Sequence, residues 1–187
     1  MPERQFISEA DEKAHYDTHQ NNPQDADYRK FLNRLLAPLK DKLAPGACGL
    51  DFGAGPGPTL SIMLEELGFP MNIYDIFYAN DPSVLQQQYD FITISETVEH
   101  LHNPGKELQR LWTLLKPGGL LGIMTQLITD ETLFPNWYYK RDPTHVCFYS
   151  RPTFHWLAKQ WQASLEFAAK DVILIHKFRN TGRRAVD

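Results

Sequence analysis

The sequence predicts an α/β protein with one doubly wound, mostly parallel sheet, helices on both faces and an antiparallel edge. Short hydrophobic segments alternate with amphipathic helical segments, as expected when crossover helices join parallel strands. One hydrophobic segment runs directly into a glycine-rich turn and a helix. The last two hydrophobic segments are close in sequence, so we expect them to pair as an antiparallel hairpin.

The individual elements follow from hydrophobic spacing and from end signals. Apolar residues three and four positions apart predict helices, and Asn103 with Pro104 is a strong helix start. The expected elements are a helix at 28–42 that Pro38 kinks or ends, a strand at 48–52, a helix at 59–68, strands at 71–75 and 91–95, a helix from 104 that Gly118 and Gly119 stop, a strand at 120–125, a helix that Ser150 and Pro152 begin, and strands at 164–167 and 172–177.

Composition narrows the class of protein. The 187 residues suffice for one domain, and a net charge of -4 supplies no basic field for nucleic acid. Two cysteines are too few for a disulfide framework or a cysteine-based zinc site. The polar N-terminus shows no secretory signal, and no apolar run reaches the ~18 residues of a membrane span. We expect a cytoplasmic protein, monomer or homodimer, that binds neither nucleic acid nor membrane.

We interpret residues 1–187 as a single domain with two distinctive segments. Residues 1–26 are polar but carry aromatic side chains, which indicates an arm that packs over the domain as a lid. Residues 126–149 are long, aromatic and without a regular pattern, which is typical of a loop that covers a substrate. We therefore expect a small, partly apolar substrate.

The most informative segment is Leu-Asp-Phe-Gly-Ala-Gly-Pro-Gly at residues 50–57, where a strand ends in three alternate glycines before a helix. Without Cβ atoms, such a turn lets the backbone approach a ligand closely. Its third glycine comes one position too early for the dinucleotide fingerprint Gly-x-Gly-x-x-Gly. Pro56 and Pro58 also remove N–H donors that a pyrophosphate uses at a helix N-terminus. The turn therefore suits a ligand without phosphate.

Two carboxylates accompany this turn. Asp51 directly precedes the glycines, where it would repel a phosphate but can hold an ammonium group or order a water. Asp75 ends the next strand, where a carboxylate can accept hydrogen bonds from both hydroxyls of a ribose. Nicotinamide dinucleotide proteins share this combination, so only the loop spacing and the prolines separate the two readings.

Several motifs follow one another in order along the chain: DFGAGPG at 51–57, Asp75, YDFITISETVEHLHNP at 89–104 and LKPGGLLGIMT at 115–125. As a set, they resemble the motifs of class I S-adenosylmethionine-dependent methyltransferases, whose fold is Rossmann-like. The resemblance covers residues 48–125 well. Further on, RDPTHVCFYSRPTF at 141–154 resembles a His-x-x-x-aromatic-Ser/Thr element of small members of this superfamily.

The resemblance implies S-adenosyl-L-methionine as cofactor, S-adenosyl-L-homocysteine as its product and a small-molecule methyl acceptor. The residues expected to bind the cofactor are Tyr16, Asp51, Gly53, Ala54, Gly55, Gly57, Asp75, Ile76, Phe77, Ser95, Glu96 and Thr97. In this assignment residues 53–55 pass under the methionine part and Asp51 lies near its amino group. Asp75 holds the ribose, and the two residues after it flank the adenine. Residues 95–97 line the floor near the sulfonium, and Tyr16 closes over the carboxylate end.

The chain departs from the family pattern in one place. Only residues 76–88 separate the second strand from the next Tyr-Asp pair, where the family usually has a helix, a strand and a further helix. We therefore expect the sheet to be shortened on its third-strand side. The acid that reads the adenine amino group has no clear counterpart, and Asp81 is the nearest candidate.

Catalysis of methyl transfer needs alignment of donor and acceptor more than a triad. A hydroxyl or amine acceptor also needs a base. His145 is the first candidate because neutral imidazole is available near pH 7, and His100 and Tyr139 follow. No carboxylate pair with metal-ligand spacing accompanies His100 and His102, so we expect no metal. Whether oxygen, nitrogen or carbon is methylated stays open.

Three alternative functions remain at this point. A NAD(P)-dependent oxidoreductase on a Rossmann-like fold is disfavoured by the glycine spacing. A transferase that uses decarboxylated S-adenosylmethionine is disfavoured because such enzymes need extra acids around the aminopropyl chain, and the sequence shows no clear set of them. A catalytically inactive, S-adenosylmethionine-binding regulatory protein is compatible with the shortened adenine region.

Overall fold

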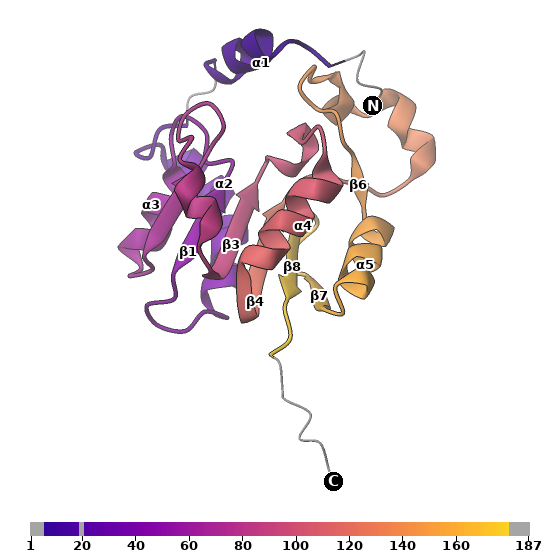
Figure 1. Cartoon of the computed structure of the whole chain (residues 1–187). Helices are drawn as coiled ribbons and strands as arrows, with labels where there is room; N and C mark the ends of the chain where they lie inside the picture. Colours follow the sequence, from indigo (N-terminus) through magenta and orange to yellow (C-terminus); the bar gives the residue numbers. More distant parts are fainter. Residues whose placement is uncertain (1–5, 19–20, 180–187) are drawn as a thin grey trace.

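The computed structural model describes residues 6–18 and 21–179. Its main sheet has the order β2-β1-β3-β4-β8-β7 (Figure 1). The strands are β1 (Gly49–Phe52), β2 (Met71–Tyr74), β3 (Tyr89–Ser95), β4 (Leu115–Met124), β7 (Ser164–Phe167) and β8 (Val172–His176). The first four pair in parallel, and β8 pairs antiparallel with both β4 and β7. The predicted α/β class and its antiparallel edge are confirmed.

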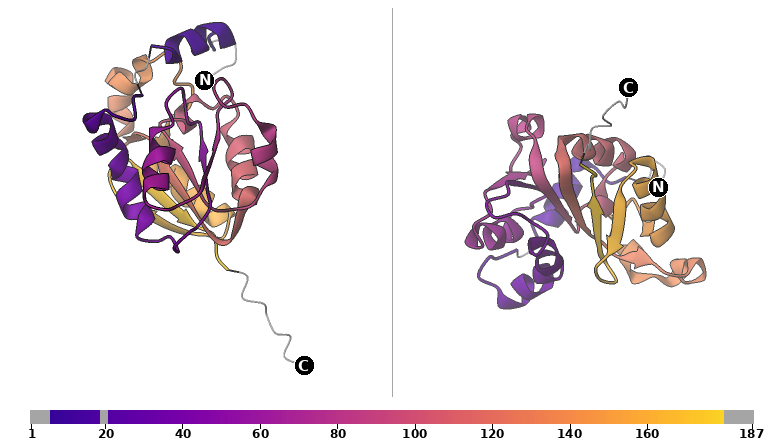
Figure 2. Two further views of the ribbon diagram at one scale, coloured as in Figure 1. Left: turned by 90° about the vertical axis from the view of Figure 1, so that its left-hand side faces the viewer. Right: turned by 90° about the horizontal axis from the view of Figure 1, so that it is seen from below.

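Helices cover both faces of the sheet, as Figure 2 shows from below. They are α2 (Ala26–Lys40) and α3 (Thr59–Glu66) on one face, and α4 (Pro104–Leu114) and α5 (Arg151–Gln160) on the other. Successive side chains of β8 point to opposite faces of the sheet and so belong to two hydrophobic cores. Ile173 and Ile175 pack with α4 and α5, whereas Val172 and Leu174 pack with α2 and α3. Such a strand, buried on both faces, is expected of a doubly wound sheet.

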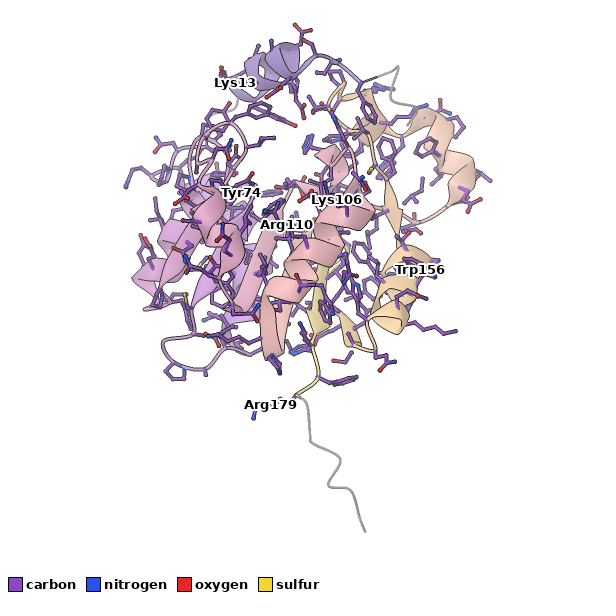
Figure 3. The ribbon with its side chains drawn as sticks, in the orientation of Figure 1. Lys13, Tyr74, Lys106, Arg110, Trp156 and Arg179 are labelled. Atoms are coloured by element: carbon purple, nitrogen blue, oxygen red, sulfur yellow. The ribbon has the colours of Figure 1, made fainter. Side chains whose placement is uncertain are left out.

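The helix starts agree with the expected signals. The Asn103 side chain accepts a hydrogen bond from the Lys106 N–H at the start of α4. Ser150 and Thr153 form a capping box at the start of α5. On α5 the buried Phe154 faces the core, whereas Trp156 is 60% exposed and points outward (Figure 3).

The expected end of α4 is wrong, and of the two effects expected of Pro38, ending the helix is excluded. Pro38 does not end α2, which continues to Lys40 because Leu35, Leu36 and Leu39 remain buried against the sheet. Gly118 and Gly119 do not stop α4. That helix already ends at Leu114, and both glycines lie inside β4, which is longer than the expected strand.

The sheet is shortened where the sequence predicted it. β2 is an edge strand, and between it and β3 the chain forms only a 3₁₀ turn, η2 (Pro82–Gln86). Asp81 caps this turn by accepting a hydrogen bond from the Ser83 N–H at 2.9 Å. Asp81 thus has a local structural contact, and its candidate role at the adenine stays a prediction.

Two further segments gather at the carboxyl ends of the parallel strands. Helix α1 (Glu9–Tyr16), which Ser8 caps, lies over this end of the sheet (Figure 1). The segment after β4 contains two short parallel strands and two 3₁₀ turns, of six and four residues, rather than an open loop. These elements are β5 (Leu127–Ile128), η4 (Glu131–Asn136), η5 (Tyr138–Arg141) and β6 (Tyr149–Ser150), and a similar turn, η3 (Val98–His100), follows β3. None of the described helices is long and apolar enough to cross a membrane.

Candidate active site

A cavity of about 790 Å³ lies beneath α1 at the carboxyl ends of β1, β2 and β3. All the residues expected to bind the cofactor line it: Tyr16, Asp51, Gly53, Ala54, Gly55, Gly57, Asp75, Ile76, Phe77, Ser95, Glu96 and Thr97. His100 and His145 line it as well, but Tyr139 does not. The structure thus brings into one cavity segments that are far apart in the sequence, although the individual roles stay predictions.

The glycine turn forms one wall of the cavity, and its backbone requires glycine. Gly53 and Gly55 have φ angles of +77° and +66°. A Cβ on Gly53 would lie 2.2 Å from Thr97 Cγ2. A Cβ on Gly57 would lie 1.9 Å from the backbone oxygen of Asn21. The turn is therefore packed tightly against its neighbours, and its glycines present only backbone to the cavity.

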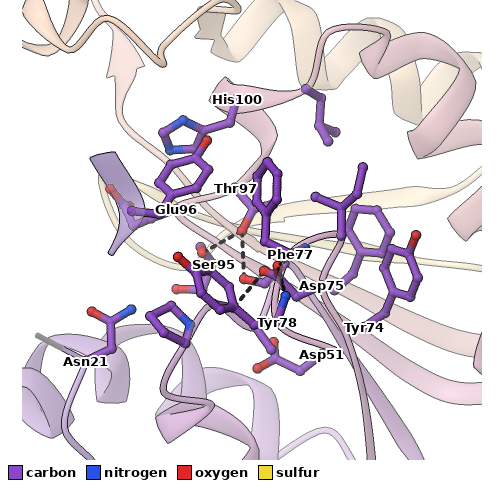
Figure 4. Close-up of a pocket in the computed structure, with 18 of the residues that line it drawn as sticks. Asn21, Asp51, Tyr74, Asp75, Phe77, Tyr78, Ser95, Glu96, Thr97 and His100 are labelled. Carbon is purple, nitrogen blue, oxygen red and sulfur yellow. Dashed lines mark hydrogen bonds between the residues drawn. The ribbon is translucent and has the colours of Figure 1, made fainter. Parts of the chain in front are cut away.

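Asp75 ties the end of β2 to this turn (Figure 4). Its Oδ2 accepts a hydrogen bond from the Gly55 N–H at 2.9 Å. Its Oδ1 accepts from the N–H groups of Phe77 and Tyr78, at 2.9 Å and 3.1 Å. The Asp75 carboxylate thus fixes the end of β2 and also lines the cavity. Its remaining lone pairs can accept hydrogen bonds from a ligand.

Asp51 is almost fully buried beneath the turn. Its Oδ1 accepts a hydrogen bond from Thr93 Oγ1 at 2.6 Å, and its Oδ2 accepts from Ser61 Oγ at 3.1 Å. Burial raises the pKa of the Asp51 carboxyl to about 6, against the opposing effect of the two hydroxyls. A cationic partner would stabilise the charged form of this carboxyl.

An acidic cluster of four side chains lies at the wall of the cavity, which its two carboxyls line: Glu96, Glu99, Thr125 and Tyr139. The Tyr139 hydroxyl donates a short hydrogen bond to Glu99 Oε1 and lies 3.4 Å from Glu96 Oε2. The Thr125 hydroxyl donates to Glu99 Oε2 at 3.0 Å. Burial raises the pKa of both carboxyls, and the charge of Glu99 raises that of Glu96 further. Burial and the two carboxylates also raise the pKa of Tyr139, so its phenol stays neutral and acts as a donor.

The two expected histidines flank this cluster. His145 Nδ1 lies 2.6 Å from the backbone oxygen of Tyr139, and His100 Nδ1 lies 3.2 Å from that of Thr144. A carbonyl only accepts, so each Nδ1 carries the proton in these contacts. The two rings meet edge to face with centroids 4.7 Å apart. Hydrogen bonds from Thr144 outweigh partial burial and lower the pKa of Asp142, at the rim of the cavity, to about 2.

Comparison of the chain with protein-family models identifies the family to which it belongs. The family described as a methyltransferase domain matches residues 19–165. The chain belongs to this methyltransferase family. The match confirms the predicted class, S-adenosylmethionine-dependent methyltransferases, and with it the expected cofactor.

Individual relatives agree with the family. The ubiquinone biosynthesis O-methyltransferase of Colwellia psychrerythraea is 30% identical over 91 residues, which are 49% of this chain and 37% of that protein. The corresponding protein of Aeromonas salmonicida is 30% identical over 77 residues, 41% of this chain and 32% of that protein. The alignments thus span about a third of the length of these curated relatives.

Solved structures share the fold. The magnesium protoporphyrin IX methyltransferase of Synechocystis, solved with bound S-adenosylhomocysteine, aligns over 93% of this chain and 97% of its own, with a TM-score of 0.61 and 14% identity. A methyltransferase of Archaeoglobus fulgidus aligns over 74% and 72%, with a TM-score of 0.58 and 21% identity. This likeness confirms the Rossmann-like architecture.

One group of side chains in this methyltransferase has metal-ligand chemistry. Glu99, His100 and His145 each bring one ligand atom into a group whose atoms all lie within 4.8 Å of one another. The Glu99 oxygens already accept hydrogen bonds from Tyr139 and Thr125. We therefore treat the group as a hydrogen-bonded cluster, and the lack of a metal stays a prediction.

The aromatic segment does not cover the cavity as expected. Trp137 packs with Phe134 and Phe148, whereas Tyr138 is 63% exposed, and none of these lines the cavity. These aromatic side chains pack on one another in a separate small cluster. Of the aromatic residues in the segment, Tyr139 alone contacts the site, through its hydrogen bond to Glu99.

Helix α1 covers the cavity instead. The Tyr16 ring meets those of His100 and Phe77, with centroids 5.3 Å and 5.8 Å away. The sequence analysis missed Glu9 and Glu12, which line the cavity from the same helix. Their spacing with Tyr16 places all three on one helical face, and this signal could have identified them.

Proposed function

We propose that this chain binds S-adenosylmethionine in the cavity and transfers its methyl group to the hydroxyl of a small, partly apolar acceptor. One observation carries the proposal: the glycine turn, the Asp75 carboxylate and the acidic cluster face a single cavity beneath α1. The O-methyltransferase names of the curated relatives favour oxygen as the methylated atom.

The residues present fit a phosphate-free nucleoside with a cationic end. The turn at Gly53 and Gly55 offers close backbone approach, and Pro56 and Pro58 contribute no N–H for a phosphate. Asp51 is buried with a raised pKa, so an ammonium group nearby would favour its charged form. Glu96 Oε1 is buried and lacks a hydrogen-bond partner among the described residues, so the cavity offers an unused acceptor.

Each part of the cavity would hold one part of the cofactor. Asp75 would accept hydrogen bonds from the ribose hydroxyls while it keeps its backbone donors. Ile76, which is 57% exposed, and Phe77 would bury apolar surface against the adenine. The turn would support the methionine part, and Asp51 would face its amino group.

S-Adenosylmethionine supplies, when bound, a methyl group that a positively charged sulfur makes electrophilic. The chain aligns the acceptor with this group and excludes water. Tyr16 and the acidic residues of α1 cover the opening, and Phe31, Leu32 and Leu101 supply apolar walls. These walls suit a small acceptor with an apolar body and a polar end.

Isothermal titration calorimetry tests the proposal. We expect saturable binding of S-adenosylhomocysteine and no heat with NADH. Asp75→Ala removes three backbone hydrogen bonds together with the ribose acceptor, so it should weaken binding at least tenfold, or about 1.4 kcal/mol. The exposed Glu65→Gln on α3 is the matched control and should bind as the wild type does. Binding of NADH without binding of S-adenosylhomocysteine would contradict the proposal.

A further inference from the structure

Glu96 has an unusual backbone conformation for a residue that is not glycine. Its φ angle is +46°, in the left-handed region. The Glu96 N–H donates to the Met124 oxygen at 2.8 Å. The Thr97 hydroxyl lies 2.9 Å from the Ser95 oxygen and 3.2 Å from the Gly53 oxygen. Hydrogen bonds on both sides thus hold Glu96 in a conformation that is unfavourable by itself, as is found at functional sites.

This conformation leaves the Glu96 carboxyl in the cavity wall with one oxygen unused. Oε1 is buried and has no hydrogen-bond partner in the described part of the chain. A buried carboxylate oxygen without a donor is destabilising. A protic group of a bound molecule would satisfy it, and an acceptor hydroxyl is such a group.

The opposite oxygen of Glu96, Oε2, lies 3.4 Å from the Tyr139 hydroxyl oxygen. Tyr139 lies behind it and donates its short hydrogen bond to Glu99, which Thr125 also contacts. His145 holds Tyr139 in place through ring contact, with centroids 4.1 Å apart, and through its backbone oxygen. The phenol therefore lies between the two carboxyls, both of which line the cavity.

We propose that Glu96 is the catalytic base that takes the proton of the acceptor hydroxyl, with Tyr139 and Glu99 as positioning residues. The inference rests on the proposed function. The acceptor oxygen forms a bond to the methyl carbon while the carbon–sulfur bond breaks and its electron pair stays on sulfur. The O–H electron pair stays on the acceptor oxygen, and its proton passes to the Glu96 carboxylate. This assigns to Glu96 the role that the sequence analysis gave first to His145.

The charges around Glu96 decide when it can act. Among the described residues, the titratable and charged groups that act on Glu96 or on its partner Glu99 are Tyr28 and Arg34 of α2, Glu99 and His100 of η3, Tyr139 of η5, Asp142 and His145. Arg34 lowers the pKa of Glu96, but it is itself paired with the buried Asp171. Burial and Glu99 outweigh it. Because Glu96 must be charged to accept a proton, methyl transfer should rise with pH through the neutral range, and removal of the Glu99 charge should move this rise to lower pH.

The first test needs no acceptor. The protein is labelled with carboxyl ¹³C-glutamate, saturated with S-adenosylhomocysteine and titrated by NMR. We expect two carboxyls to titrate well above the ordinary range of glutamate. Glu96→Gln should remove one and lower the pKa of the other, whereas Glu65→Gln should change neither. If the Glu96 carboxyl titrates in the ordinary range, the inference is overturned.

The second test measures methyl transfer to catechol as a hydroxyl probe. Glu96→Gln should lower kcat about 10²-fold to 10⁴-fold, a far larger effect than any change in its affinity for S-adenosylhomocysteine, which calorimetry measures alongside. Glu99→Gln should lower kcat less than Glu96→Gln does and shift the pH profile to lower pH, whereas Tyr139→Phe removes a hydrogen bond that lowers the pKa of Glu96 and should shift the profile to higher pH. A wild-type rate in Glu96→Gln would overturn the inference, and so would activity that a chelator abolishes and Mg²⁺ restores. Loss of S-adenosylhomocysteine binding by the wild type would instead overturn the proposed function.

Discussion

The two ends of the cavity are built in different ways. At the proposed cofactor end, one continuous turn supplies the wall, with Asp75 fixed to it by backbone hydrogen bonds. At the proposed acceptor end, side chains from α1, η3, η5 and the segment after η5 meet across the chain. The first end is fixed by backbone contacts and would recognise its ligand by close backbone approach together with the Asp75 and Asp51 carboxyls. The second depends on protonation and on the position of α1, so we expect changes at the two ends to affect binding and catalysis separately.

The largest expected effect belongs to Gly53→Ala at the cofactor end. The new Cβ would lie 2.2 Å from Thr97 Cγ2 at a φ of +77°. Strain and overpacking should lower the free energy of unfolding by about 2–4 kcal/mol. Displacement of the turn should weaken S-adenosylhomocysteine binding about 100-fold or more, or about 2.7 kcal/mol. Urea denaturation and calorimetry measure the two effects.

Gly46→Ala is the matched control for this variant. Its φ of +72° gives the same backbone strain, but no atom lies within 4 Å of the new Cβ. It should lose about 1–2 kcal/mol of stability and keep its affinity. Equal affinity of both variants would show that the turn does not contact the ligand.

Asp51→Asn tests whether the buried charge at the cofactor end lowers the free energy of unfolding. The folded pKa of about 6 exceeds the ordinary 3.8, so the stabilising contribution of the carboxyl is present below pH 4 and is lost as the pH rises to 6. At pH 8 the variant should therefore be more stable than the wild type by up to about 3 kcal/mol, with no difference below pH 4. Thermal unfolding across this range checks the effect, and a constant difference would refute the cause.

Asp75→Asn separates the two structural duties of that carboxyl. The amide oxygen can keep the bonds from Phe77 and Tyr78, whereas the amide nitrogen cannot accept from Gly55. We expect S-adenosylhomocysteine affinity to fall about 10-fold, or about 1.4 kcal/mol, with an almost unchanged melting temperature. Calorimetry decides this, and wild-type affinity would limit Asp75 to capping the strand.

The smallest expected effect belongs to the contact of α1 with the loop after β2. The Tyr78 hydroxyl donates to Asp17 Oδ1 at 2.6 Å, just after the helix ends. Tyr78→Phe should free this end of α1 and speed S-adenosylhomocysteine release about 2–5-fold, because one exposed hydrogen bond contributes about 0.5–1 kcal/mol. Stopped-flow dissociation measures it, with the exposed Tyr138→Phe as control. Equal rates in both variants would mean that α1 does not gate release.

The difference between the two ends also explains what the sequence could reveal. The turn at 53–57 and Asp75 were predictable because the requirement for glycine and the strand-end position of the acid are local. The partnership of Glu96, Glu99 and Tyr139 was not, because it joins residues 40 or more positions apart. The prediction that the aromatic segment covers the substrate was wrong for a related reason. A segment whose aromatic side chains pack on one another has the same amino-acid composition as one whose aromatic side chains cover a ligand.

A structure of the S-adenosylhomocysteine complex tests the central claim most directly. The account predicts that the ribose hydroxyls lie within hydrogen-bond distance of Asp75 and that the homocysteine rests on Gly53 and Gly55. The vacated methyl position should then face Glu96. A ligand whose ribose lies away from Asp75, or whose sulfur faces away from Glu96, would contradict it.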